Sequence, residues 1–321
     1  AKMGEVLTNS QIGGRRNLII NGAMQIFQRG TSFSGTNAYN ADRWLVDDNQ
    51  DGGGQSTDAP NDFNFSLKIN PTSGQNAGLR QAIELPSAGE GGIFRSGQKF
   101  TLSFYLKSDN AGEAINIFIA SGTTVTATTT SQVNDTSTGL TTTTSWARYT
   151  YTFSSNNVGG SDTCYNIVPY VTTPSGAVYW TGVQLELGNQ ATPFEHRSFA
   201  EELTLCQRFY HFSGFPKIIP GQDQSDGSLV DYEGQIFSWT LGGSNRHATS
   251  YSFPVKMRSN PAIVMYGPID GTSARSAPYN SATQETVSAY YNESPNGLHG
   301  YFTCGSNTTG QRFFLSADIE F

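Results

Sequence analysis

The stretch Phe100-Thr101-Leu102-Ser103-Phe104-Tyr105-Leu106 places an apolar residue at every second position. Successive side chains of a β-strand point to opposite faces, so these four apolar residues share one face. The pattern predicts a strand with one side in a hydrophobic core. Val183, Leu185 and Leu187 repeat it, and Gly182 breaks the phase after Trp180 as a β-bulge does.

Similar apolar runs, bounded by Gly, Asn, Asp and Ser, recur along the whole chain. They cover residues 43–46, 63–69, 79–85, 115–120, 146–153, 165–171 and 178–187, and then 232–241, 249–255, 262–266, 286–291, 298–304 and 312–321. Many short strands without an internal repeat predict a sandwich or jelly roll. The Thr-rich stretch 123–144 predicts a polar hairpin or edge strands that face solvent or a sister subunit.

One segment predicts a helix. Ser198 to Glu201 form a capping box, and Phe199, Leu203, Cys206 and Tyr210 follow at helical spacing. We therefore predict an all-β chain in four parts. These are an N-terminal virion-docking arm (1–16), a jelly-roll β-sandwich (17–197), a short connecting helix (198–213) and a smaller C-terminal β domain (214–321).

Composition narrows the class of protein. The net charge is −7 and the basic residues are scattered, which argues against a nucleic-acid partner. The apolar runs are too short to cross a membrane and no signal-peptide pattern opens the chain, so we expect a soluble protein made in a cytoplasm. Three cysteines at unpatterned spacings, Cys164, Cys206 and Cys304, are expected to be buried and unpaired.

The sequence favours a protein that is not an enzyme. It lacks the nucleophile elbow, the phosphate-binding loop, the dinucleotide fingerprint and the His-Glu-x-x-His zinc motif. Its four histidines are scattered singletons, to which we assign no role. A polysaccharide depolymerase stays as a minor alternative, because paired carboxylates are recognised by their separation in space. We predict no catalytic residue and no cofactor apart from calcium.

One stretch has the spacing of a calcium-binding loop. Asp47, Asn49 and Asp51 are followed by Gly52 and, six residues after it, by Asp58. These oxygen-bearing residues are the candidate metal ligands. The alternative is that Asp, Asn and Gly gather there only because a loop between strands favours them.

Aromatic residues next to polar turns are the candidate ligand-binding residues, because a sugar ring stacks on an aromatic face while polar groups take its hydroxyls. Trp44, Trp146 and Trp180 lie within predicted strands, so we expect them in the core. The better candidates lie in the C-terminal domain: Trp239, Tyr279, Tyr290, Tyr291 and Tyr301.

Two stretches resemble a family of bacteriophage structural proteins, of the tail-fibre or head-fibre kind, with a domain like a carbohydrate-binding module. The first runs from Asn17 to Phe33 and continues as Tyr39 to Trp44, and the second runs from Gly182 to Tyr210. The resemblance implies a jelly roll, a short helix and a variable C-terminal β domain, in a homotrimer within the virion. Asn21 and Gly22 are expected to form a turn, and Trp44 to be a core aromatic.

Two functions follow as hypotheses. In the first, the chain is a tail-fibre-type appendage that attaches the phage to a host surface polysaccharide, with its N-terminal arm docked on other virion proteins. In the second, it is a capsid-decorating head fibre or tail assembly protein with no ligand. Both place it in the virion, assembled in the host cytoplasm, without nucleic acid and without membrane insertion.

Overall fold

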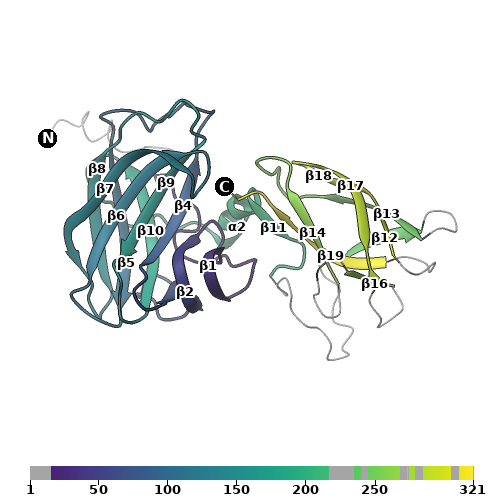
Figure 1. The fold of residues 1–321 in the computed structure, drawn as a ribbon, viewed down its shortest axis with the longest axis horizontal. Helices are drawn as coiled ribbons and strands as arrows, with labels where there is room; N and C mark the ends of the chain where they lie inside the picture. The colour runs from purple at the N-terminus through teal and green to yellow at the C-terminus, as the bar shows by residue number, and fades with distance from the viewer. Residues whose placement is uncertain are drawn as a thin grey trace. The chain divides into compact units, whose positions relative to one another are not determined.

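The computed structural model describes residues 16–216, 235–240, 245–267, 273, 275–278, 285–304 and 311–320. These residues form an all-β protein with one short helix among them, α2 (Phe199–Gln207), as predicted (Figure 1). The chain divides into two compact units: residues 1–27, 31–202 and 321 form the first, and residues 28–30 and 203–320 the second. Among the described residues, no helix has the length and apolar character needed to span a membrane.

The first unit is a β-sandwich. Its strands are β1 (Ser32–Tyr39), β2 (Leu45–Ser56), β3 (Ser66–Pro71), β4 (Ala77–Glu84), β5 (Lys99–Ser108), β6 (Ala114–Gly122), β7 (Thr128–Thr141), β8 (Ala147–Ser154), β9 (Cys164–Val171) and β10 (Val178–Leu187). Hydrogen bonds connect them in the order β7-β6-β9-β4-β2-β3-β10-β5-β8. β2 joins the two halves of this order, because residues 45–47 pair with β4 and residues 50–56 with β3.

The core of the sandwich contains the residues that alternation predicted. Phe100, Leu102, Phe104 and Leu106 of β5 are fully buried. The bulge predicted at Gly182 is also present, since the pairing of β10 with β5 slips between Thr181 and Gln184. All three cysteines are buried, as predicted.

The Thr-rich stretch forms edge strand β7, which pairs with β6. An edge strand with an apolar outer face would invite pairing with other chains, so Thr, Ser and Gly suit this position. Whether β7 faces solvent or a sister subunit stays a prediction.

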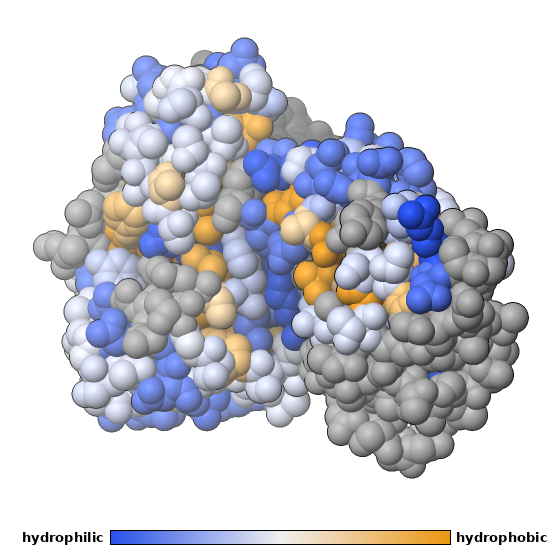
Figure 2. Space-filling model, turned by 45° about the vertical axis from the view of Figure 1, so that its right-hand side comes forward, coloured by the Kyte–Doolittle hydropathy of each residue, from blue (hydrophilic) through white to orange (hydrophobic). Residues whose placement is uncertain are grey.

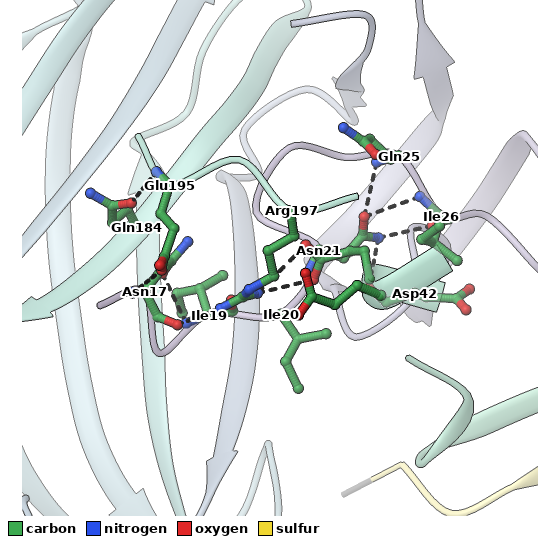
Figure 3. A network of polar contacts seen from close by, with 12 residues as sticks. Asn17, Ile19, Ile20, Asn21, Gln25, Ile26, Asp42, Gln184, Glu195 and Arg197 are labelled. Atoms are coloured by element: carbon green, nitrogen blue, oxygen red, sulfur yellow. Dashed lines mark hydrogen bonds and ion pairs between the residues drawn. The ribbon is translucent and has the colours of Figure 1, made fainter. Parts of the chain in front are cut away.

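Asn21 organises the start of the first unit (Figure 3). Its backbone is left-handed, with φ 55°, and its side chain is fully buried. The side-chain oxygen accepts from the backbone N–H of Gln25 and Ile26, at 2.9 and 3.0 Å. The side-chain nitrogen donates to the carbonyl oxygens of Ile26 and Asp42, at 2.9 and 3.0 Å. Asn21 therefore stabilises the predicted turn and also fixes the backbone at residue 42.

The backbone of Asn21 makes two further hydrogen bonds, to Glu202 and Trp44. Its N–H donates to Oε1 of Glu202 at 2.6 Å, and its carbonyl oxygen accepts from Nε1 of the buried Trp44 at 2.9 Å. Position 22 requires glycine, because a Cβ there would lie 2.1 Å from the carbonyl oxygen of Val183.

The second stretch of the family resemblance makes hydrogen bonds to the first (Figure 3). Arg197 donates to the carbonyl oxygens of Asn17 and Ile19 and forms an ion pair with Glu202 at 3.1 Å. Glu195 accepts from the backbone N–H of Arg16 and Asn17. The two stretches thus form one hydrogen-bonded network within the first unit, through contacts between residues 166 or more positions apart in the sequence.

We predict that Asn21→Ala lowers the free energy of unfolding by roughly 3–5 kcal/mol, because it strains a left-handed backbone and leaves buried polar groups unpaired. Asn21→Gly is the matched control, since it removes the same hydrogen bonds but accepts the backbone angle. It should lose about 1 kcal/mol less. Urea unfolding of the three proteins tests this, and equal stability of the alanine variant and the wild type would contradict the role given to Asn21.

The second unit is smaller and is centred on β19 (Gln311–Asp318). The other strands are β11 (Tyr210–Phe212), β12 (Ile236–Thr240), β13 (Arg246–Ser252), β14 (Ala262–Tyr266), β15 (Arg275–Pro278), β16 (Glu285–Thr286), β17 (Ser288–Ser294) and β18 (Gly297–Thr303). The first part of β19 pairs with β12 and β15, and the remainder pairs with β11 and β14. The predicted alternation of Phe313, Leu315 and Ala317 puts these residues in the core.

The helix is shorter than the predicted 198–213. It ends at Gln207, and Tyr210, expected on its apolar face, lies in β11 instead. The reason is that Tyr210 to Phe212 pair with β19. These long-range hydrogen bonds outweigh the local preference for a helix, which was inferred from only four apolar residues at helical spacing.

Three residues from the first family stretch belong to the second unit. Gln28 donates to the carbonyl oxygen of Tyr210 at 2.8 Å and accepts from the N–H of Phe212 at 3.3 Å. Arg29 stacks on the Tyr210 ring at 3.6 Å and forms an ion pair with Asp318 at 3.0 Å.

His211 is a buried titratable group in the second unit. Its Nε2 lies 2.7 Å from the hydroxyl of Tyr251, and the two rings are stacked. Burial lowers the pKa of His211 to about 4 and raises the pKa of Tyr251 to about 12. Both groups are therefore neutral at physiological pH.

The buried His211 predicts a loss of stability in acid. The folded protein keeps the imidazole neutral down to about pH 4, whereas the unfolded chain protonates it below about pH 6.5. The stability present above pH 6.5 should therefore fall as the pH is lowered toward 4, by roughly 3 kcal/mol from this group. His211→Gln, which keeps a hydrogen-bonding group but does not titrate, should flatten this part of the profile. Chemical unfolding at pH 7, 5.5 and 4 measures it, and parallel profiles would contradict the prediction.

Candidate functional site

Three of the predicted ligand-binding residues fall in one row across the second unit. On the strands β12-β13-β18-β17, Trp239 is paired with Ala248, Ala248 with Tyr301, and Tyr301 with Tyr290. Directly opposed residues of antiparallel strands present their side chains on the same face. Trp239 and Tyr301 therefore share a face, about 10 Å apart, and Tyr290 holds the next position in the row. We call this face the aromatic row face.

The burial pattern shows that this face points outward. Trp239 is 67% exposed, and Arg246, Ser250, His299 and Asn292 around the row are exposed as well. The alternate residues on the same strands, among them His247, Phe302 and Leu298, are buried. The aromatic row face is thus the solvent side of a sheet whose other side forms the core.

An exposed tryptophan of this degree is exceptional in the chain. Figure 2 shows one side of the molecule, where hydrophilic and intermediate residues predominate and hydrophobic ones form small groups. Among the described residues, the well-exposed large apolar side chains are Ile93, Phe199, Trp239 and Val264, and Trp239 is the most exposed. A large aromatic ring left exposed gains no free energy from burial on folding, so that gain is available when a ligand or partner covers it.

Arg246 was not predicted as a site residue. Its guanidinium lies over the ring of Tyr301, 4.9 Å from the centroid, and its strand position is next to Ala248 on the same face. Only the strand register brings Arg246 to the row, and the sequence did not show this register. Chemically, the face offers aromatic rings for stacking, one cation, and hydroxyl, amide and imidazole groups for hydrogen bonds.

The remaining predicted residues are placed differently. Tyr291 pairs with Gly300, one position along the strand from Tyr290, and so is not in the row. Tyr279 lies outside the described residues. Of the predicted set, Trp239, Tyr301 and position 290 thus fall in one row, together with Arg246, and Tyr279 stays a prediction.

The core prediction for the three tryptophans of the first unit is confirmed for Trp44 and Trp180 and wrong for Trp146. Trp44 and Trp180 are fully buried. Trp146 is half-buried, because it precedes β8 and its indole lies outside the sheet core. Its Nε1 donates to Asp58 at 2.9 Å, and its ring meets Tyr179 edge-to-face.

The stretch with calcium-loop spacing is a strand, which corrects the expected loop. Residues 45–56 form β2, so the backbones of Asp47 and Asp51 are roughly 13 Å apart. Calcium ligands must instead converge to roughly 2.5 Å from one ion. Asp51 accepts from Thr72 at 2.8 Å, and Asn49 pairs along the strand with Thr36.

Asp58 is held away from such a site. Hydrogen bonds from Lys107 and Trp146 lower the pKa of its carboxyl group. The glycines serve packing: a Cβ on Gly54 would lie 1.9 Å from the carbonyl oxygen of Thr31. The donor set Asp47, Asn49, Asp51 and Asp58 does not fit a calcium loop.

Comparison with known proteins gives structural likenesses only. No family model and no curated protein matches the chain. A tailspike protein 4 enzymatically active domain of bacteriophage CBA120 is 18% identical, with a TM-score of 0.35 over 54% of this chain and 21% of that one. A xylan-binding CBM22-1 domain from Paenibacillus barcinonensis is 12% identical, with a TM-score of 0.34 over 50% and 94%.

A putative sugar binding protein from Bacteroides thetaiotaomicron is 14% identical, with a TM-score of 0.34 over 54% of this chain and the whole of that one. At such scores none of the three bears on function.

Proposed function

We propose that the chain is a tail-fibre-type virion appendage that binds a host-cell surface glycan through the aromatic row face, without catalysis. The observation that carries this proposal is the 67% exposure of Trp239 in strand register with Tyr301 and Tyr290. Trp239 and Tyr301, about 10 Å apart on one face, suit an extended polysaccharide, of which two separate sugars can stack on the two rings.

Polar side chains next to the aromatic row suit the hydroxyl groups of a sugar. Ser250, His299 and Asn292 occupy one cross-strand row next to the aromatic one, and all three are exposed. Their hydroxyl, imidazole and amide groups can exchange hydrogen bonds with sugar hydroxyls. Binding of this shallow kind is weak per site, so several copies on one particle would supply the avidity that attachment needs.

The proposed place of the chain in the virion rests on the family resemblance. The opening and junction stretches form the network around Asn21, so they serve the scaffold rather than the ligand. Docking on other virion proteins is assigned to the arm 1–16, of which residues 1–15 lie outside the described part. A head fibre or tail assembly protein without a ligand is the alternative.

We predict that Trp239→Ala weakens binding of the full chain to purified bacterial surface polysaccharides about tenfold, because it removes one stacking platform worth roughly 1.4 kcal/mol. The thermal midpoint should not change, since the side chain is exposed. Ile93→Ala, another exposed apolar residue but in the first unit, is the control and should bind as the wild type does. Biolayer interferometry against an immobilised panel measures this. If the wild-type chain binds none of the panel, the alternative without a ligand is favoured.

We also propose that the chain is a homotrimer, as the family resemblance implies. Light scattering at micromolar concentration should give three times the chain mass of 34.7 kDa. A mass of one chain would contradict a stable trimer and leave the binding proposal untouched.

A further inference from the structure

The dipeptide Asn-Gly occurs twice in the chain, as Asn21-Gly22 and as Asn296-Gly297. In such a pair the backbone nitrogen of the glycine can attack the side-chain carbonyl carbon of the asparagine. Glycine favours this attack because it has no Cβ to shield the nitrogen or to restrict the backbone. Whether the attack occurs in a folded protein depends on how the asparagine is held, and the two pairs differ in this respect.

Asn296 lies in the turn between β17 and β18. Ser294 pairs with Gly297, so Pro295 and Asn296 are the two residues of the turn. Asn296 is exposed, and within the described part of the chain its side-chain amide has no hydrogen-bond partner. Only its backbone is bonded: the N–H donates to Oγ of Ser294 at 3.3 Å, and the carbonyl oxygen accepts from the N–H of Phe253 at 2.9 Å. The side chain can therefore rotate toward the nitrogen of Gly297.

Asn21 is held in the opposite way (Figure 3). It is fully buried, and its side-chain amide makes four hydrogen bonds to backbone groups. An attack by the nitrogen of Gly22 requires the amide to leave all four, which happens only when this part of the first unit opens. Folding therefore protects the first Asn-Gly pair.

We propose that Asn296 is a site of spontaneous deamidation in the folded protein, whereas Asn21 is not. The nitrogen of Gly297 forms a bond to Cγ of Asn296 and gives up its proton, while the Cγ–Nδ2 bond breaks and ammonia leaves. The product is a cyclic imide. Water then opens either of its two C–N bonds, which gives aspartate or isoaspartate at position 296. The oxidation state of the chain does not change, and water is the only other reactant.

The modification acts on the β17–β18 pair. Both products carry a negative charge, and in isoaspartate the main chain passes through the former side chain and is one carbon atom longer. The two-residue turn then no longer matches the spacing of the pairs Ser294–Gly297 and Glu293–Leu298 that follow it. Leu298 is buried in the core of the second unit. Modified protein should therefore melt at a lower temperature, by a few degrees.

The test follows the full chain by peptide mass spectrometry during incubation at pH 9, where loss of the proton from the attacking nitrogen is easier than at pH 7. In guanidinium chloride the two Asn-Gly pairs should react at similar rates. In the folded protein Asn296 should react on the order of a hundredfold faster than Asn21, because four hydrogen bonds hold the latter. Asn292, exposed on the same strand but followed by Glu293, is the control and should keep its amide.

A variant tests the consequence for stability. Asn296→Ser cannot deamidate at this position, so its thermal midpoint should stay constant during the incubation in which that of the wild type falls. If Asn296 reacts in guanidinium chloride but keeps its amide in the folded protein, the turn protects it and the inference is wrong. Reaction of Asn21 or Asn292 in the folded protein as fast as that of Asn296 would contradict it equally.

Discussion

The first unit depends on a single left-handed residue, Asn21, whose polar groups are all used. Its side chain makes four hydrogen bonds to backbone groups, and its own N–H and carbonyl oxygen reach Glu202 and Trp44. Asn tolerates this backbone angle better than most residues, and its amide supplies an oxygen that accepts two hydrogen bonds and a nitrogen that donates two. The turn therefore fixes the path of residues 21–26 and the entry into β2 at once.

Alternation in the sequence predicts much of the fold because period-two patterns reflect burial directly. Phe100 to Leu106 and Phe313 to Ala317 are in the cores as expected, and Gly182 marks a bulge. The errors arise where a local signal competes with long-range pairing. Helical spacing extended the helix past Gln207, and a run of Asp and Gly suggested a loop where close packing of β1 and β3 on β2 requires glycine.

The candidate site was only partly predictable. An aromatic residue beside polar ones pointed to Trp239 and Tyr301, but their alignment depends on which residues oppose each other across three strand pairs. Nothing local in the sequence encodes that register, so the sequence does not predict the place of Arg246 in the row. Trp146 shows the converse error: a residue just before a strand can look like a core position and yet lie half outside it.

The assignment of residues 28–30 to the second unit bears on how such chains can diversify. An exchange of the C-terminal domain between related genes would leave Gln28 and Arg29 behind. Gln28 makes hydrogen bonds to backbone atoms of Tyr210 and Phe212, which any incoming domain with the same strand would supply. Arg29 instead contacts the side chains of Tyr210, Asp318 and Glu320. An incoming domain can thus differ at its exposed faces, provided that it keeps the side chains that contact Arg29.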